Sequence, residues 1–147
     1  FIEFMDVGNH NGWKPEKVIS SKEILQILDE EFALENLPKN YVGEVARRYR
    51  YADGSGEIGV ISSVSQPFCG ECSRARLTAD GKLISCLFAK DGFCLRQPLR
   101  DGLGDESLLE LIRATWKIRD DRYSEQRHEL VNRPSPGSKV EMSYVGG

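Results

Sequence analysis

Apolar positions recur with either strand or helical spacing along the chain, and this pattern predicts its main elements. The opening Phe1–Met5 alternates from its first residue, which predicts a strand. Ser20-Ser-Lys-Glu23 has the form of a capping box and predicts a helix that ends before Leu37-Pro38. This helix is expected to bury one apolar face, made of Ile24, Leu25, Ile27, Leu28 and Phe32. A second helix is predicted from near Asp105, burying Leu108, Leu109, Leu111, Ile112 and Trp116.

Between these helices the pattern predicts strands that turn residues separate. Tyr41–Tyr51 is strand-like, and Asp53-Gly-Ser-Gly56 predicts a turn. A second strand follows with the alternating residues Ile58, Val60 and Val64. Arg74–Thr78 and Lys82–Leu87 flank Asp80-Gly81, which is a strong hairpin signal. Hairpins combined with separate helices predict an α+β fold.

The length of the hairpin loop decides which side chains share a face of the sheet. A two-residue loop would set Cys86 opposite Ala75, whereas a three-residue loop over 79–81 would pair Cys86 with Arg74. Paired residues point to the same face, and so do residues two apart on one strand. Only the three-residue loop therefore places Cys86, Arg74 and Arg76 on one face, and we expect this loop if the three act together.

Composition and charge argue against several classes of protein. The 147 residues carry a net charge of −3 and 39% hydrophobic residues. No apolar run approaches the ~20 residues of a membrane helix, and no secretory leader opens the chain, so we expect a cytoplasmic protein. Arg47, Arg48 and Arg50 are expected on a solvated strand, because a net acidic chain gives little support for a nucleic-acid patch. Since the chain opens without Met and within a strand, we expect a fragment of a longer chain.

Three cysteines give the most specific chemical signal. Cys69, Cys72 and Cys86 have the spacing C-x2-C-x13-C, and two thiolates at i and i+3 can bind one metal centre from a single tight turn. Three thiolates on a 4Fe-4S cluster would leave one iron open to a small molecule. Cys94 could instead complete a four-cysteine zinc site of the zinc-ribbon type, as a binding module. Unliganded core thiols are the third alternative, and a disulfide framework is disfavoured at this length.

Longer strings around these cysteines resemble a known family. Cys69-Gly-Glu-Cys-Ser-Arg-Ala-Arg-Leu-Thr78, followed by Gly81-Lys-Leu-Ile-Ser-Cys-Leu-Phe88, resembles the C-terminal half of the MoaA family. These are the radical S-adenosylmethionine GTP 3′,8-cyclases of molybdenum cofactor biosynthesis. Phe1–Asp6 resembles the family's last core barrel strand, and Gly146-Gly147 resembles its terminal double glycine. The resemblance implies the end of an incomplete TIM-type (βα) barrel over about 1–40, and a cluster- and GTP-binding region with a small antiparallel sheet over about 41–147.

The resemblance also implies roles for individual residues. Cys69, Cys72 and Cys86 would be the ligands of the family's second 4Fe-4S cluster. The GTP-binding segment would be Arg74, Ala75 and Arg76. Met5 would contact S-adenosylmethionine, and the Gly146-Gly147 tail would enter the active site. Cys94 has no role in the family's pattern.

The implied activity belongs to a larger enzyme. That enzyme converts GTP to (8S)-3′,8-cyclo-7,8-dihydroguanosine 5′-triphosphate, using S-adenosylmethionine and a first 4Fe-4S cluster in an N-terminal half. The first cluster's C-x3-C-x2-C motif is absent here, so the fragment alone is expected to be inactive and no catalytic residue is assigned in it. GTP and the N-terminal half are the expected partners, a homodimer is left open, and neither nucleic acid nor membrane is expected.

Overall fold

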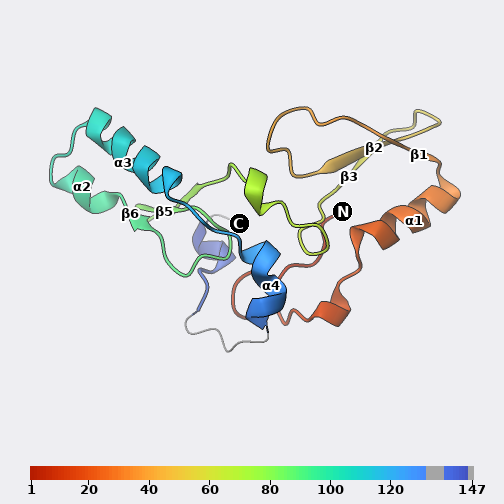
Figure 1. The fold of residues 1–147 in the computed structure, drawn as a ribbon, viewed down its shortest axis with the longest axis horizontal. Coiled ribbons are helices and arrows are strands. Elements are labelled where there is room, and N and C mark those ends of the chain that lie inside the picture. Colours follow the sequence, from red (N-terminus) through yellow and green to blue (C-terminus); the bar gives the residue numbers. More distant parts are fainter. Residues whose placement is uncertain (132–137, 146–147) are drawn as a thin grey trace. The chain divides into compact units, whose positions relative to one another are not determined.

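The computed structural model describes residues 1–131 and 138–145, which form two compact units (Figure 1). The first unit combines Phe1–Asp6 with Gly12–Cys72. The second combines Val7–Asn11 with the described residues from Ser73 onward. Each unit contains one antiparallel sheet of three short strands together with helices, which confirms the predicted α+β class. The predicted division near residue 40 stays a prediction.

Helix α1, Ser21–Glu31, begins where the capping box predicts and follows a 3-10 turn, η1, at Pro15–Lys17. The Ser20 hydroxyl oxygen accepts a hydrogen bond from the Glu23 amide at 3.2 Å, which satisfies one of the free amides of the first turn. The expected burial of the apolar face is wrong for Ile27 and Phe32, which are 59% and 49% exposed. Strands of three to five residues offer too little surface to cover an 11-residue helix.

The first sheet has the order β1-β2-β3, with β1 at Leu34–Asn36, β2 at Arg47–Tyr51 and β3 at Glu57–Val60. The predicted turn joins β2 to β3, where the Asp53 carboxylate accepts from the Ser55 amide at 2.8 Å. Its arginines pair with carboxylates on neighbouring strands: Arg48 with Glu57 at 2.6 Å, and Arg50 with Glu35 at 2.8 Å. The expectation of a solvated strand charge is therefore confirmed for Arg50, whose side chain is 51% exposed, whereas that of Arg48 is 25% exposed. Strand β2 is shorter than the predicted Tyr41–Tyr51, because a turn precedes it.

The N-terminal segment differs most from its prediction. Instead of a full strand, one parallel bridge joins Ile2 to Ile61, supported by a hydrogen bond of 3.1 Å from the Glu3 amide to the Ile61 carbonyl. The burial pattern is also inverted, because Glu3 is 2% exposed whereas Phe1 and Ile2 are 57% and 60% exposed. Hydrogen bonds to the Glu3 carboxylate from two other parts of the first unit, Ser21 and the Val64–Ser65 loop, account for this inversion.

The second sheet has the order β4-β5-β6, with β4 at Arg76–Leu77, β5 at Lys82–Ile84 and β6 at Phe93–Cys94. Arg76 pairs with Ile84, and the Thr78 amide donates to the Lys82 carbonyl at 2.9 Å. Residues 79–81 therefore form a three-residue loop, with Gly81 in the left-handed region at φ 80°. The three-residue register is thus confirmed, and the two-residue alternative is excluded.

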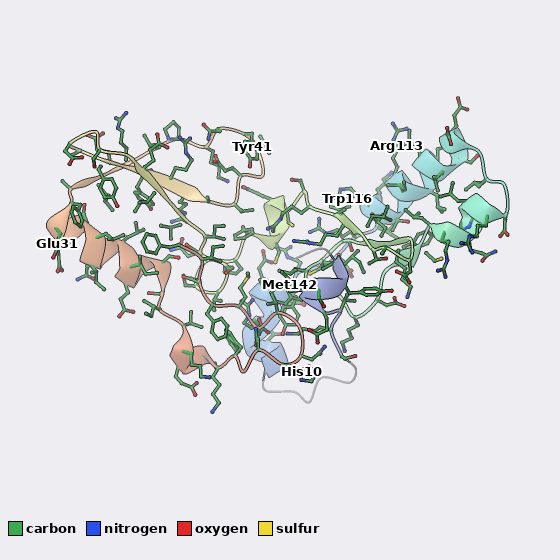
Figure 2. All side chains as sticks on the ribbon, turned by 180° about the vertical axis from the view of Figure 1, so that it is seen from behind. His10, Glu31, Tyr41, Arg113, Trp116 and Met142 are labelled. Atoms are coloured by element: carbon green, nitrogen blue, oxygen red, sulfur yellow. The ribbon has the colours of Figure 1, made fainter. Side chains whose placement is uncertain are left out.

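Three helices and a 3-10 turn complete the second unit: α2 at Arg96–Arg100, α3 at Asp105–Lys117, α4 at Tyr123–Val131 and η3 at Met142–Val145. Helix α3 starts where predicted; Figure 2 shows its side chains, with Arg113 and Trp116 labelled. Its apolar face is half-buried, and Leu109 is 46% exposed. Among the described residues, no helix combines the length and hydropathy needed to cross a membrane.

Candidate metal centre and its arginines

Cys69 and Cys72 lie on one tight turn of the first unit. Cys69–Glu71 forms the 3-10 turn η2, and the Cys72 amide donates to the Cys69 carbonyl at 3.2 Å. Both cysteines are half-buried and neither forms a disulfide. The turn thus brings the backbones of Cys69 and Cys72 close together, as two ligands of a single metal centre need.

An ion pair connects this turn to the segment after β1. Lys39 Nζ lies 2.7 Å from Glu71 Oε2, and this hydrogen bond lowers the pKa of the Glu71 carboxyl. Both side chains are exposed, so salt screens the pair and its contribution to stability is small. The pair orients the middle of the Cys69–Cys72 turn without burying it.

Cys86 follows β5 in the second unit and is half-buried. Its sulfur accepts a hydrogen bond from the Phe88 amide, with a nitrogen–sulfur distance of 3.5 Å. The Ala89 amide donates to the Cys86 carbonyl at 3.1 Å, which closes a turn directly after the cysteine. A backbone amide that points at a sulfur stabilises the charged thiolate, and such bonds tune iron–sulfur centres. The local structure around Cys86 thus suits a thiolate ligand.

The register of the hairpin relates the arginines to Cys86. Arg76 is half-buried and pairs with Ile84, and the same register would set Arg74 opposite Cys86 if the pairing continued two residues beyond these strands. Thr78 and Ile84 share this face and are 3% and 2% exposed. Arg74 is exposed, beyond the buried part of the face. Strand β5 ends at Ile84 and a turn begins at Cys86, so a face shared by Cys86 and the two arginines stays a prediction.

Cys94 lies elsewhere on the same sheet. On β6 it pairs with Lys82, which precedes Cys86 by four residues, or roughly 13 Å along an extended strand. Two sulfurs on one tetrahedral zinc ion lie within about 4 Å of each other, given Zn–S bonds of about 2.3 Å. The sheet therefore separates Cys94 from Cys86, and this argues against the four-cysteine zinc site.

The three thiols are the donor type that an iron–sulfur cluster uses. Cys69 and Cys72 belong to the first unit and Cys86 to the second, so the three-cysteine centre stays a prediction. In the part of the chain that the structure describes, no three His, Cys, Asp or Glu side chains are gathered as metal ligands.

Comparison with known proteins decides the family. The family model for Molybdenum Cofactor Synthesis C matches residues 1–125. The chain belongs to this molybdenum cofactor synthesis family. It is 47% identical over 148 aligned positions to proteins named GTP 3′,8-cyclase from Staphylococcus saprophyticus, Staphylococcus carnosus and Staphylococcus aureus. Each match covers 100% of this chain and 44% of the relative, so the chain spans less than half the length of these curated relatives.

Two further residue assignments that the family resemblance implied are not tested by the described structure. Met5 is half-buried in the N-terminal segment of the first unit. Gly146 and Gly147 lie outside the described residues. Just before them, Tyr144 in η3 forms a hydrogen bond with Asp80 in the hairpin loop; bonds from Thr78 and Tyr144 lower the pKa of the Asp80 carboxyl. The last described residues of this family member are therefore fastened to the hairpin that carries the arginines.

The sequence prediction missed two groups of residues beside the candidate ligands. Glu3 is a buried carboxylate on the segment that also carries Met5, and its place in an apolar strand pattern was the available signal. Phe88 and Tyr123 form a stacked aromatic pair close to Cys86, and the buried Arg127 lies beside it. The sequence of α4 has no helical apolar periodicity, so the local pattern could not predict that Tyr123 and Arg127 lie beside Phe88.

Proposed function

We propose that the chain is the C-terminal, GTP-binding and cluster-binding region of a GTP 3′,8-cyclase of molybdenum cofactor biosynthesis. The full enzyme would be a radical S-adenosylmethionine lyase that converts GTP to its 3′,8-cyclic dihydroguanosine triphosphate. Family membership and the 47% identity to proteins of that name support the proposal. The observation that carries it is the β4–β5 register with its three-residue loop, because this is the register in which Cys86 and both arginines would share one face.

In this proposal Cys69, Cys72 and Cys86 would hold a 4Fe-4S cluster through three thiolates. When bound, such a cluster supplies one iron without a protein ligand, to which a guanine base can coordinate. The 3-10 turn that closes between Cys69 and Cys72 supports this assignment. So does the amide that donates to the third sulfur.

Arg74, Ala75 and Arg76 would bind GTP. A guanidinium group donates in a planar fork that matches phosphate oxygens, and these charge-assisted bonds are stronger than neutral ones. Ala75 is exposed and adds little bulk between the two arginines. Arg74 is exposed and Arg76 is half-buried opposite Ile84, so at least the first guanidinium group is accessible to a ligand.

The remaining partners would come from a longer chain. An N-terminal half would carry the first cluster and cleave S-adenosylmethionine, with Met5 in contact with that cofactor and Gly146-Gly147 reaching the active site. Residues 1–40 would complete a barrel with it. Exposed apolar side chains on the first unit support such a covering partner, and a second copy of the chain is the other candidate: Phe1, Ile2, Ile27 and Phe32. We place the enzyme in the cytoplasm, and residues 1–147 alone are expected to bind GTP without converting it.

Metal and sulfide analysis of an anaerobically reconstituted sample tests the proposal. Iron and acid-labile sulfide in equal amounts, with brown colour, are expected. One zinc per chain in a colourless sample would favour the zinc-ribbon-like module with Cys94. A sample that takes up neither metal would leave a purely structural domain.

A further inference from the structure

An aromatic pair in the second unit includes Phe88, whose amide donates to the third candidate ligand, Cys86. Phe88 and Tyr123 stack with ring centroids 4.4 Å apart and planes inclined by 19°. Phe88 is 8% exposed, and Tyr123 is the first residue of α4. An offset stack of this kind stabilises by more than the burial of the rings alone. The pair therefore connects α4 to the segment that follows Cys86.

Two cations reinforce this pair. The guanidinium carbon of Arg127, one turn along α4, lies 5.3 Å from the Phe88 ring centroid and 5.7 Å from that of Tyr123. Lys139 Nζ lies 5.2 Å and 4.5 Å from the same two centroids. Both cations are within the range in which the negative face of a ring attracts positive charge. Arg127 is 2% exposed, so water screens its contact only weakly.

The backbone of Phe88 then reaches the cysteine. Its amide is the donor to Cys86 Sγ at 3.5 Å, and only Leu87 separates the two residues. The next residue, Ala89, is held on both sides: its amide donates to Cys86, and its carbonyl accepts from Val140 at 2.9 Å. A ring held by stacking and a backbone held by these bonds leave the Phe88 amide little freedom to turn away from the sulfur.

We propose that Phe88 and Tyr123 are positioning residues for the Cys86 ligand: their stack holds the Phe88 amide on the sulfur. The inference rests on the proposed function, because the sulfur is taken to be a cluster ligand. Hydrogen bonds to cluster sulfurs stabilise the more negative, reduced state and so raise the reduction potential. Outer contacts of this kind also slow the loss of metal. Loosening the stack is therefore expected to lower the potential and to speed the loss of iron.

The alternative is that the pair is ordinary core packing. In that case Tyr123→Leu would reduce stability without a specific effect on the cluster. The conservative Tyr123→Phe separates the two, since it keeps the stack and removes only the hydroxyl. Phe93→Leu is a matched control, because Phe93 is an aromatic residue of the same unit, on β6, and is 40% exposed.

The experiment uses the 147-residue chain, reconstituted anaerobically with iron and sulfide. Tyr123→Leu is expected to lose iron to a chelator about two- to tenfold faster than the unsubstituted chain, which is the change expected for one lost stack. Its midpoint potential, from a redox titration followed by electron paramagnetic resonance, is expected to fall. Tyr123→Phe and Phe93→Leu are expected to match the unsubstituted chain in both measurements.

A second measurement keeps the inference testable without a cluster. In the apo chain, amide hydrogen exchange at Phe88 is expected to be faster in Tyr123→Leu and in the milder Lys139→Met than in Tyr123→Phe. Unchanged exchange, or an unchanged potential and rate of iron loss in Tyr123→Leu, would overturn the inference. An unsubstituted chain that takes up no iron and sulfide would instead overturn the proposed function, and the exchange data would still decide whether the stack holds the amide.

Discussion

The buried carboxylate of Glu3 is expected to stabilise the first unit more than any exposed charge there. Its Oε1 accepts from the Ser21 amide at 2.7 Å and from the Ser65 hydroxyl at 2.5 Å. Its Oε2 accepts from the amides of Val64 and Ser65, both at 2.7 Å. Ser21 is the first residue of α1, so the carboxylate also lies at the positive end of the helix dipole. One side chain therefore joins the N-terminal segment, the start of α1 and the loop that leads to Cys69.

The size of the effect follows from these bonds. Burial by itself would raise the pKa of Glu3, but the hydrogen bonds from Ser65, Ser21 and Val64 outweigh it and lower the pKa from 4.5 to about 2. This lowering corresponds to about 3 kcal/mol at neutral pH. Glu3→Gln keeps the shape and one acceptor, and is expected to cost about that amount. Glu3→Ala leaves three amide donors without an acceptor and is expected to cost about 4 kcal/mol.

Urea unfolding with tryptophan fluorescence measures the cost. Trp13 Nε1 donates to the Phe4 carbonyl at 2.7 Å, so in a Trp116→Phe background Trp13 reports on the segment beside Glu3. The exposed Glu31, at the end of α1, gives a matched control, and Glu31→Gln is expected to change the free energy of unfolding by less than about 0.5 kcal/mol.

The pH dependence of the free energy of unfolding can refute this account of Glu3. Because the folded-state pKa of Glu3 is depressed, its stabilisation is present above pH 4.5 and is lost as the pH falls towards about 2. The difference between the unsubstituted chain and Glu3→Gln should therefore shrink across this range. A difference of equal size at pH 7 and near pH 2, or a Glu3→Gln variant as stable as Glu31→Gln at pH 7, would show that the carboxylate does not stabilise the unit as argued.

Three further predictions concern the candidate ligands and the helix cap. Arg74→Ala and Arg76→Ala are each expected to weaken GTP binding by about 1–3 kcal/mol, measured by calorimetric titration of the reconstituted chain; unchanged affinity in both would remove the arginine assignment. Cys86→Ser is expected to abolish the stable cluster, whereas Cys94→Ser should keep its iron and sulfide; equal metal loss would favour the zinc module. Ser20→Ala is expected to lower the free energy of unfolding by about 1 kcal/mol in the same urea assay, and no change would contradict the cap.

Features that depend on neighbours in sequence could be predicted. The Ser20 cap bonds a residue three positions ahead, and the Asp53 turn bonds a residue two positions ahead. The Cys69–Cys72 turn closes over three residues in the same way. In each case the donor and the acceptor lie within four residues of each other, so the local sequence is enough to predict the hydrogen bond.

Features that depend on residues distant in the sequence could not be predicted. The buried state of Glu3 requires Ser21, Val64 and Ser65, which are 18 to 62 positions away. Phe88 stacks on Tyr123 of α4, a helix whose sequence has no apolar periodicity. For Ile27 the error was the reverse, because the sequence predicted burial and the side chain is exposed. Helical spacing identifies an apolar face but does not show whether a partner covers it.

The hairpin combines a feature that the local sequence predicts with one that it does not. Its loop is local, but the loop decides how β4 and β5 pair. A shift of one residue in pairing moves every side chain of a strand to the other face. Gly81 fixes the longer loop: its φ of 80° suits glycine, and a Cβ there would lie 2.8 Å from the Cβ of Arg96. Apolar alternation along β4 and β5 is too short to choose between registers, since these strands have two and three residues. The pairing of Arg76 with Ile84 is therefore determined by the glycine turn five residues after Arg76 rather than by the hydrophobic pattern of the strands.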